Sequence, residues 1–118
     1  MLKKTSFTRA ASTNPDQIDS LQRRYARLRL EQRLNFVDVH DASHGGGFKE
    51  LCRAAAEQED LENEIAAAEY FLQGDGVTPM EGNPFASCDG NMEETKLRRY
   101  YEINPSDDVM LEIADVGA

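Results

Sequence analysis

Residues 48–73 carry an uninterrupted helical spacing that constrains the fold of this chain more than any other feature. Six successive steps, alternately of three and four residues, connect Leu51, Ala54, Gln58, Leu61, Ile65, Ala68 and Leu72. This period places all seven side chains along one line on an α-helix, with the opposite side left to polar residues. Gly74 follows, a residue that commonly ends helices. We therefore expect a long helix that packs against a neighbour along a single seam.

A second helix is predicted over residues 15–37. Asn14, Pro15 and Gln17 form a typical helix start, with a capping side chain, a proline in the first turn and a capping-box glutamine. The seam of this helix comprises Ile18, Leu21, Tyr25, Leu28 and Gln32. Three glycines at 45–47 separate the two helices, so the chain is predicted to fold back into a long antiparallel helical hairpin.

The charges beside the two seams favour the same arrangement. In an antiparallel pair, Arg24 falls between Glu57 and Glu64. Arg29 is expected near Glu62. Exposed ion pairs contribute only about 0–1 kcal/mol each, so they select the orientation while the apolar seam supplies the stability.

The first helix has a second apolar face that the hairpin leaves uncovered. It comprises Ala26, Leu30, Leu34 and Val37. Three kinds of contact could bury this face: with the C-terminal segment, with a second copy of the chain in a homodimer, or with a foreign partner.

The chain is expected to form a single domain over residues 1–118 with a mainly α (α+β) fold. The C-terminal third is expected to add a small element to the helical hairpin. Residues 1–14 read as a polar, basic arm, and glycines and prolines make 74–91 an irregular loop. Residues 92–118 are predicted to form a small β-hairpin packed on the helices. A helix over 92–102, supported by a Glu94–Arg98 pair, is the alternative for the first arm of that hairpin.

Composition narrows the classes of function. The 118 residues include 13 basic and 22 acidic side chains, for a net charge of −9, which argues against direct nucleic-acid binding. No stretch approaches the roughly 20 apolar residues of a membrane span, so no membrane association is expected. With only Cys52 and Cys88 available for a disulfide, a reducing compartment, the cytoplasm, is predicted.

The motifs of known chemistry are absent or incomplete. The tetrapeptide that starts at His44 matches an oxyanion loop, yet no G-x-S-x-G nucleophile motif accompanies it. Neither a phosphate-binding loop nor a complete calcium loop occurs. We therefore predict no enzyme activity and no cofactor, and leave open whether His40 and His44 bind a metal.

The acidic surplus on and after the second helix is the strongest indication of function. We expect a partner-binding surface composed of Glu57, Glu59, Asp60, Glu62, Glu64, Glu69, Asp75 and Glu81. Such a surface attracts a basic protein partner, in particular one whose basic groove holds nucleic acid. By analogy of type with small acidic anti-defence inhibitors of phages and mobile elements, the prediction is an inhibitor or adaptor. The alternative is a structural or assembly subunit that uses its spare apolar helix faces.

Overall fold

The computed structural model describes residues 15–107 and is mainly helical. Its elements are α2 (Pro15–Ser43), α3 (Phe48–Gly74), the short 3₁₀ helix η1 (Pro84–Ser87) and α4 (Asn91–Ile103). No strand occurs within residues 15–107. The predicted capping residue Asn14 and the basic arm lie outside the described residues.

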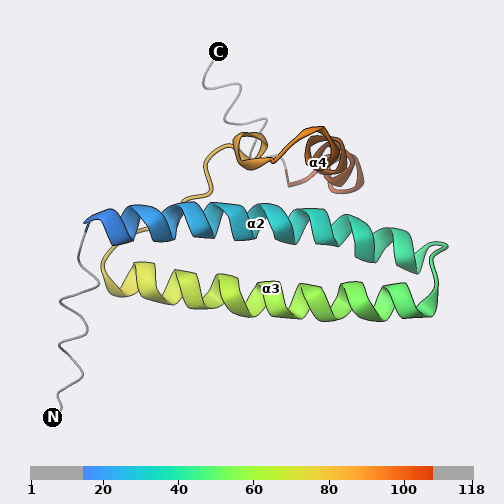
Figure 1. Ribbon diagram of the computed structural model, residues 1–118, viewed down its shortest axis with the longest axis horizontal. Coiled ribbons are helices and arrows are strands. Elements are labelled where there is room, and N and C mark those ends of the chain that lie inside the picture. Colours follow the sequence, from blue (N-terminus) through green and yellow to red (C-terminus); the bar gives the residue numbers. More distant parts are fainter. Residues whose placement is uncertain (1–14, 108–118) are drawn as a thin grey trace, which may run out of the picture.

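The predicted antiparallel hairpin is confirmed. Helices α2 and α3 run side by side in opposite directions and are joined by the glycine turn (Figure 1). Their shared core contains Tyr25, Leu28, Leu61, Ile65, Ala68 and Leu72. Both seams found in the sequence therefore meet, and removal of their apolar surface from water is the main source of stability.

One buried polar side chain ties the two helices together in the half of the hairpin nearer the glycine turn. Asn35 of α2 is 8% exposed, and its amide nitrogen donates to the carbonyl oxygen of Ala54 at 2.8 Å and to Oε1 of Gln58 at 2.9 Å. A buried amide is costly without partners, so these two bonds favour one alignment of α2 along α3. Gln58 thus has a defined partner within the seam.

Helix α2 ends at Ser43, six residues beyond the predicted end at 37. Helix α4 contacts this additional part of α2: Lys96 pairs with Asp38 at 2.9 Å and Arg99 with Asp41 at 2.6 Å. Gly46 then closes the turn, where a Cβ atom would lie only 2.7 Å from the backbone of Ala42.

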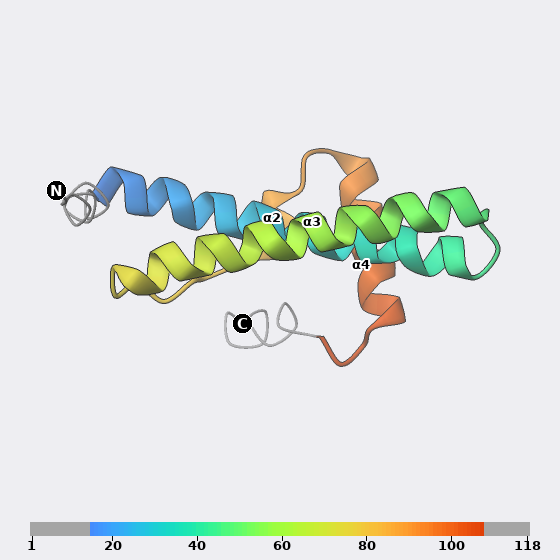
Figure 2. The same ribbon diagram turned by 90° about the horizontal axis from the view of Figure 1, so that it is seen from below.

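The second apolar face of α2 is covered by the C-terminal part of the chain. Helix α4 and η1 lie on the side of α2 away from α3 (Figure 1), and α4 crosses α2 instead of running along it (Figure 2). Leu30 and Leu97 are fully buried and Val37 is 2% exposed. Of the three contacts that could bury this face, the structure therefore shows the one with the C-terminal segment of the same chain.

The predicted C-terminal β-hairpin is wrong in its first arm, which forms α4, as in the alternative interpretation. Glu94 and Arg98 pair at 2.6 Å, as expected for a helix, and Glu93 and Glu94 lie in the first turn, where negative charge is favourable. The helix forms because Leu97 then enters the core while the charged residues stay outside. The second arm, 109–113, lies outside the described residues.

Candidate functional site

The outer surface of α3 carries the most prominent group of unpaired charges. Four of the predicted partner-binding residues, Glu57, Glu59, Asp60 and Glu62, are exposed there. We call these four the acidic surface. Within residues 15–107 none of them forms an ion pair or a side-chain hydrogen bond. Their carboxylates are therefore available to a partner.

Two other predicted site residues are engaged by α2 at the edge of the seam. Glu64 pairs with Arg24 at 2.7 Å, which confirms one of the two neighbours predicted for Arg24; the other, Glu57, forms no ion pair within residues 15–107. Glu69 accepts a hydrogen bond from the hydroxyl of Tyr25 at 3.1 Å. The side chain of Glu64 is still 48% exposed, so it extends the negative field with part of its charge offset.

The last two predicted site residues lie away from the acidic surface. Asp75 caps the end of α3, where its backbone N–H donates to the carbonyl oxygens of Phe71 and Leu72. Glu81 lies beside α2, where it binds Arg33 at 2.5 Å and Arg29 at 3.2 Å. Arg29 thus pairs with Glu81, and within residues 15–107 no ion pair joins it to Glu62, the neighbour expected from the sequence.

All five arginines of α2 are paired with carboxylates. The pairs are Arg23 with Asp19, Arg24 with Glu64, Arg27 with Glu31 and Glu93, Arg29 with Glu81, and Arg33 with Glu81 and Asp107. The basic row of the sequence is therefore neutralised within the fold. On α3, by contrast, the carboxylates of the acidic surface have no ion-pair partner within residues 15–107.

Glu93, whose pKa is strongly lowered, is one of these paired carboxylates, and its contact with Arg27 holds α4 to α2. Glu93 accepts two parallel hydrogen bonds from Arg27, both at 2.8 Å, and a third from the backbone N–H of Asp89 at 2.7 Å. The Arg27 contact lowers the pKa of Glu93 to about 2, against a smaller opposing effect of burial. Glu93 therefore positions α4 and is not free to act on a ligand.

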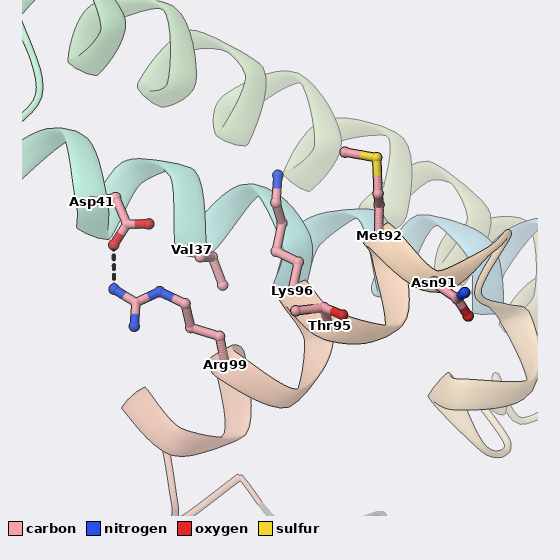
Figure 3. Close-up of a pocket in the computed structure, with 7 residues that line it drawn as sticks. All are labelled: Val37, Asp41, Asn91, Met92, Thr95, Lys96 and Arg99. Atoms are coloured by element: carbon pink, nitrogen blue, oxygen red, sulfur yellow. Dashed lines mark hydrogen bonds and ion pairs between the residues drawn. The ribbon is translucent and has the colours of Figure 1, made fainter.

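A groove between α2 and α4 is a concave feature that the sequence did not indicate (Figure 3). About 410 Å³ in volume, it is lined by Val37, Asp41, Asn91, Met92, Thr95, Lys96 and Arg99. Met92 is 87% exposed at its edge, whereas Lys96 and Arg99 are already paired with α2. The i, i+3, i+4, i+7 spacing of the α4 residues could have revealed this surface, had the segment been read as a helix.

The side chains considered as metal ligands do not gather into a site. His40 and His44 stack with ring centroids 4.2 Å apart, and Nδ1 of His44 lies 2.8 Å from the carbonyl oxygen of His40. Between residues 15 and 107 there is no group of three or more histidine, cysteine, aspartate or glutamate side chains that could hold a metal ion. In the same range no helix is long and apolar enough to cross a membrane.

Comparison of the chain with protein-family models, curated proteins and solved structures finds no match in any of the three. The functional argument therefore depends on the surfaces described above.

Proposed function

We propose that this protein is a non-enzymatic, acidic interaction module of the cytoplasm that docks a basic surface of a protein partner, as an inhibitor or adaptor. One observation supports the proposal above all others: four carboxylates on the outer surface of α3 are unpaired in the described part of the chain, while every arginine of α2 is paired. Concentrated charge of one sign steers an oppositely charged partner and speeds association.

The density of this charge suggests which basic surface fits. The four carboxylates fall within residues 57–62, about 7.5 Å of helix axis at ~1.5 Å per residue. Duplex DNA carries one charge per ~1.7 Å of its axis, about four over the same length. A protein groove that normally binds nucleic acid would therefore meet a similar number of negative charges on α3.

Direct binding of nucleic acid fits the same observations poorly. Phosphate contacts need free lysine or arginine side chains. The arginines of α2 are held by carboxylates, and the acidic surface would repel a polyanion.

The test is partner capture by matched charge-reversal variants of the full chain. Glu59→Lys with Asp60→Lys reverses the two acidic side chains that lie farthest from the seam. The control, Asp89→Lys with Glu102→Lys, makes the same change in net charge at exposed positions elsewhere. Capture from extracts of the native cell should be lost in the first variant and retained in the control.

Salt and a competitor make the outcome specific. Electrostatic docking weakens as ionic strength rises, because the screening length falls from about 10 Å at 0.1 M to about 3 Å at 1 M. A short DNA duplex should displace the captured partner. Equal capture by both variants, or capture indifferent to salt and duplex, would contradict the proposal.

Exposed apolar residues favour the second candidate function, an assembly subunit. Tyr70 and Phe71 form an edge-to-face pair on α3 and are 75% and 52% exposed, and Phe48 is 81% exposed. The second apolar face of α2 is covered by α4, so Tyr70, Phe71 and Phe48 would have to supply the contact. A molecular weight that rises with concentration in light scattering, and falls in a Tyr70→Ser, Phe71→Ser variant, would favour a homo-oligomer.

A further inference from the structure

The side of α3 that faces away from α2 carries a second line of residues at helical spacing, separate from the seam against α2. Steps of four or three residues connect its members, which at about 100° per residue lie within about 80° of the helix circumference. The members are Phe48, Cys52, Ala55, Glu59, Glu62, Ala66 and Tyr70. We call these seven the outer seam. Such spacing is typical of a helix that packs along another helix.

The outer seam has no helix packed against it in the described part of the chain. Helix α2 lies along the other side of α3, and η1 and α4 lie beyond α2 (Figure 1). Seen from below, α3 is unobstructed along its whole length (Figure 2). All seven residues of the outer seam are exposed, including the large rings of Phe48 and Tyr70. The outer seam therefore has the spacing of a packed surface without the contact that would bury it.

The two ends of the outer seam are aromatic. Phe48 and Tyr70 are 22 residues apart, which corresponds to about 33 Å along the helix axis at ~1.5 Å per residue. Tyr70 also borders a hollow of about 480 Å³ at the end of α3, together with Phe71, Gln73 and Gly74. Each end can therefore hold an apolar side chain of a partner.

Between the two rings the outer seam is narrow and negatively charged. Cys52, Ala55 and Ala66 are small, so a second helix can approach at the short end of the usual interaxial range of about 8–10 Å. Glu59 and Glu62 lie in the middle, and neither forms an ion pair within residues 15–107. A partner that buries these two carboxylates must supply positive charge, because a buried charge is costly unless it is paired.

We infer that the outer seam binds a single α-helix of the partner protein, with apolar side chains at both ends and lysine or arginine in the middle. The inference rests on the proposed function, because it assigns the basic surface of the partner to one helix. The apolar side chains pack on Phe48 and Tyr70, and the basic side chains pair with Glu59 and Glu62. A helix that reaches both rings is about 22 residues long.

The central charges argue against a second copy of this chain as the occupant. Residue 59 is midway between residues 48 and 70, so an antiparallel pair that joins Phe48 to the copy's Tyr70 places each Glu59 opposite the other. A parallel pair places Glu59 and Glu62 beside the same residues of the copy. Like charges in contact oppose association, whereas a basic helix meets the same carboxylates with opposite charge.

The test uses a synthetic helical peptide of about 25 residues as the probe, titrated with the full chain by fluorescence anisotropy at about 0.1 M salt. The peptide has leucine at the seam positions near both ends and lysine at the two seam positions in the middle. One comparison peptide has glutamate in place of these lysines, and the other has serine in place of the leucines. The first peptide should bind saturably, and each comparison peptide should bind at least tenfold more weakly. Equal binding of the first peptide and either comparison peptide would overturn the inference.

Variants of the full chain test where the first peptide binds. Tyr70→Ser and Phe48→Ser each remove an exposed ring from the outer seam, and Met92→Ser removes an exposed apolar side chain from α4 as the matched control. Glu59→Lys reverses one of the two central charges. All four residues are exposed, so the fold should be retained, which circular dichroism checks. Affinity should fall at least fivefold in the three outer-seam variants and stay unchanged in Met92→Ser.

The results separate this inference from the proposed function. Weaker binding in Glu59→Lys with unchanged binding in Tyr70→Ser and Phe48→Ser would overturn the inference and leave acidic docking intact. Unchanged binding in Glu59→Lys would count against both. A dimer in light scattering that Tyr70→Ser abolishes would assign the outer seam to a second copy and overturn the inference as well.

Discussion

The ion pair between Arg27 and Glu93 should make the attachment of α4 depend on pH, and Glu93→Gln tests this most directly. The pKa of Glu93 falls from its ordinary value of 4.5 to about 2 in the folded protein. A depressed carboxylate pKa stabilises the folded state above the unfolded value, and this stabilisation is lost as pH falls toward 2. Stability should therefore decrease on acidification.

The magnitude follows from the size of the shift. At about 1.36 kcal/mol per pKa unit, the full shift corresponds to about 3.4 kcal/mol. The side chains of Arg27 and Glu93 are 37% and 25% exposed, so solvent screening reduces the expected contribution to about 1–2 kcal/mol. Proton linkage predicts that less than half of this contribution to the free energy of unfolding remains at pH 3.

The assay is urea unfolding of the native protein and of Glu93→Gln at pH 7 and pH 3. The difference in free energy of unfolding should be about 1–2 kcal/mol at pH 7 and should shrink to less than half at pH 3. Glu94→Gln is the matched control. The carboxylate of Glu94 forms an exposed pair with Arg98, so this substitution should change the free energy of unfolding by less than about 0.5 kcal/mol. A Glu93→Gln effect of the same size at both pH values would refute the assignment to an ionised carboxylate.

Three further predictions follow from burial and exposure. Leu97→Ala should destabilise the protein by about 2–4 kcal/mol in urea unfolding, because Leu97 is fully buried where α4 meets α2. Arg24→Ala should cost less than about 1 kcal/mol in the same assay, since its ion pair is exposed; a larger loss would show that this pair, and not the seam, dominates the hairpin. Burial and the contact with Asp107 raise the pKa of Tyr100 to about 12, so Tyr100→Phe should remove a phenol that ionises near pH 12 in an absorbance titration. Loss of a phenol that ionises near pH 10 would contradict this environment.

The helical hairpin could be predicted from the sequence because its information is local. The 3-4 spacing of Leu61, Ile65 and Leu72 encodes one face of a helix whatever lies around it. Two such seams joined by a short glycine turn have few ways to bury both faces. The contact between Arg24 and Glu64 then follows from the alignment of the seams.

Most of the ion pairs between the arginines of α2 and carboxylates elsewhere in the chain could not be predicted in the same way. Arg29 was expected near Glu62, but the connection after α3 folds back along α2 and brings Glu81 to Arg29 and Arg33. The path of an irregular loop depends on contacts between residues far apart in the chain, which no periodic pattern encodes. The same limit applies to Asn35, whose burial depends on what faces it.

The segment 92–103 shows the limit of local patterns. Its apolar residues fit either a strand or a short helix, and intrinsic preferences are weak enough for tertiary contacts to decide. Helix α4 buries Leu97 against the second face of α2 and places Glu93 against Arg27. The sequence left strand and helix open for this segment because the surface that selects the helix belongs to another part of the chain.

The sequence by itself determined the two long helices, their antiparallel pairing and the surplus of acidic residues on α3. Periodicity and charge along the chain are sufficient for these, since each is a property of neighbouring residues. Only the tertiary structure decided which acidic residues remain available: it paired Glu81 and Glu93 with arginines and left Glu59 and Asp60 exposed. The physical reason is that a charge is neutralised by whatever lies within a few ångströms of it, and the fold determines which residues come that close.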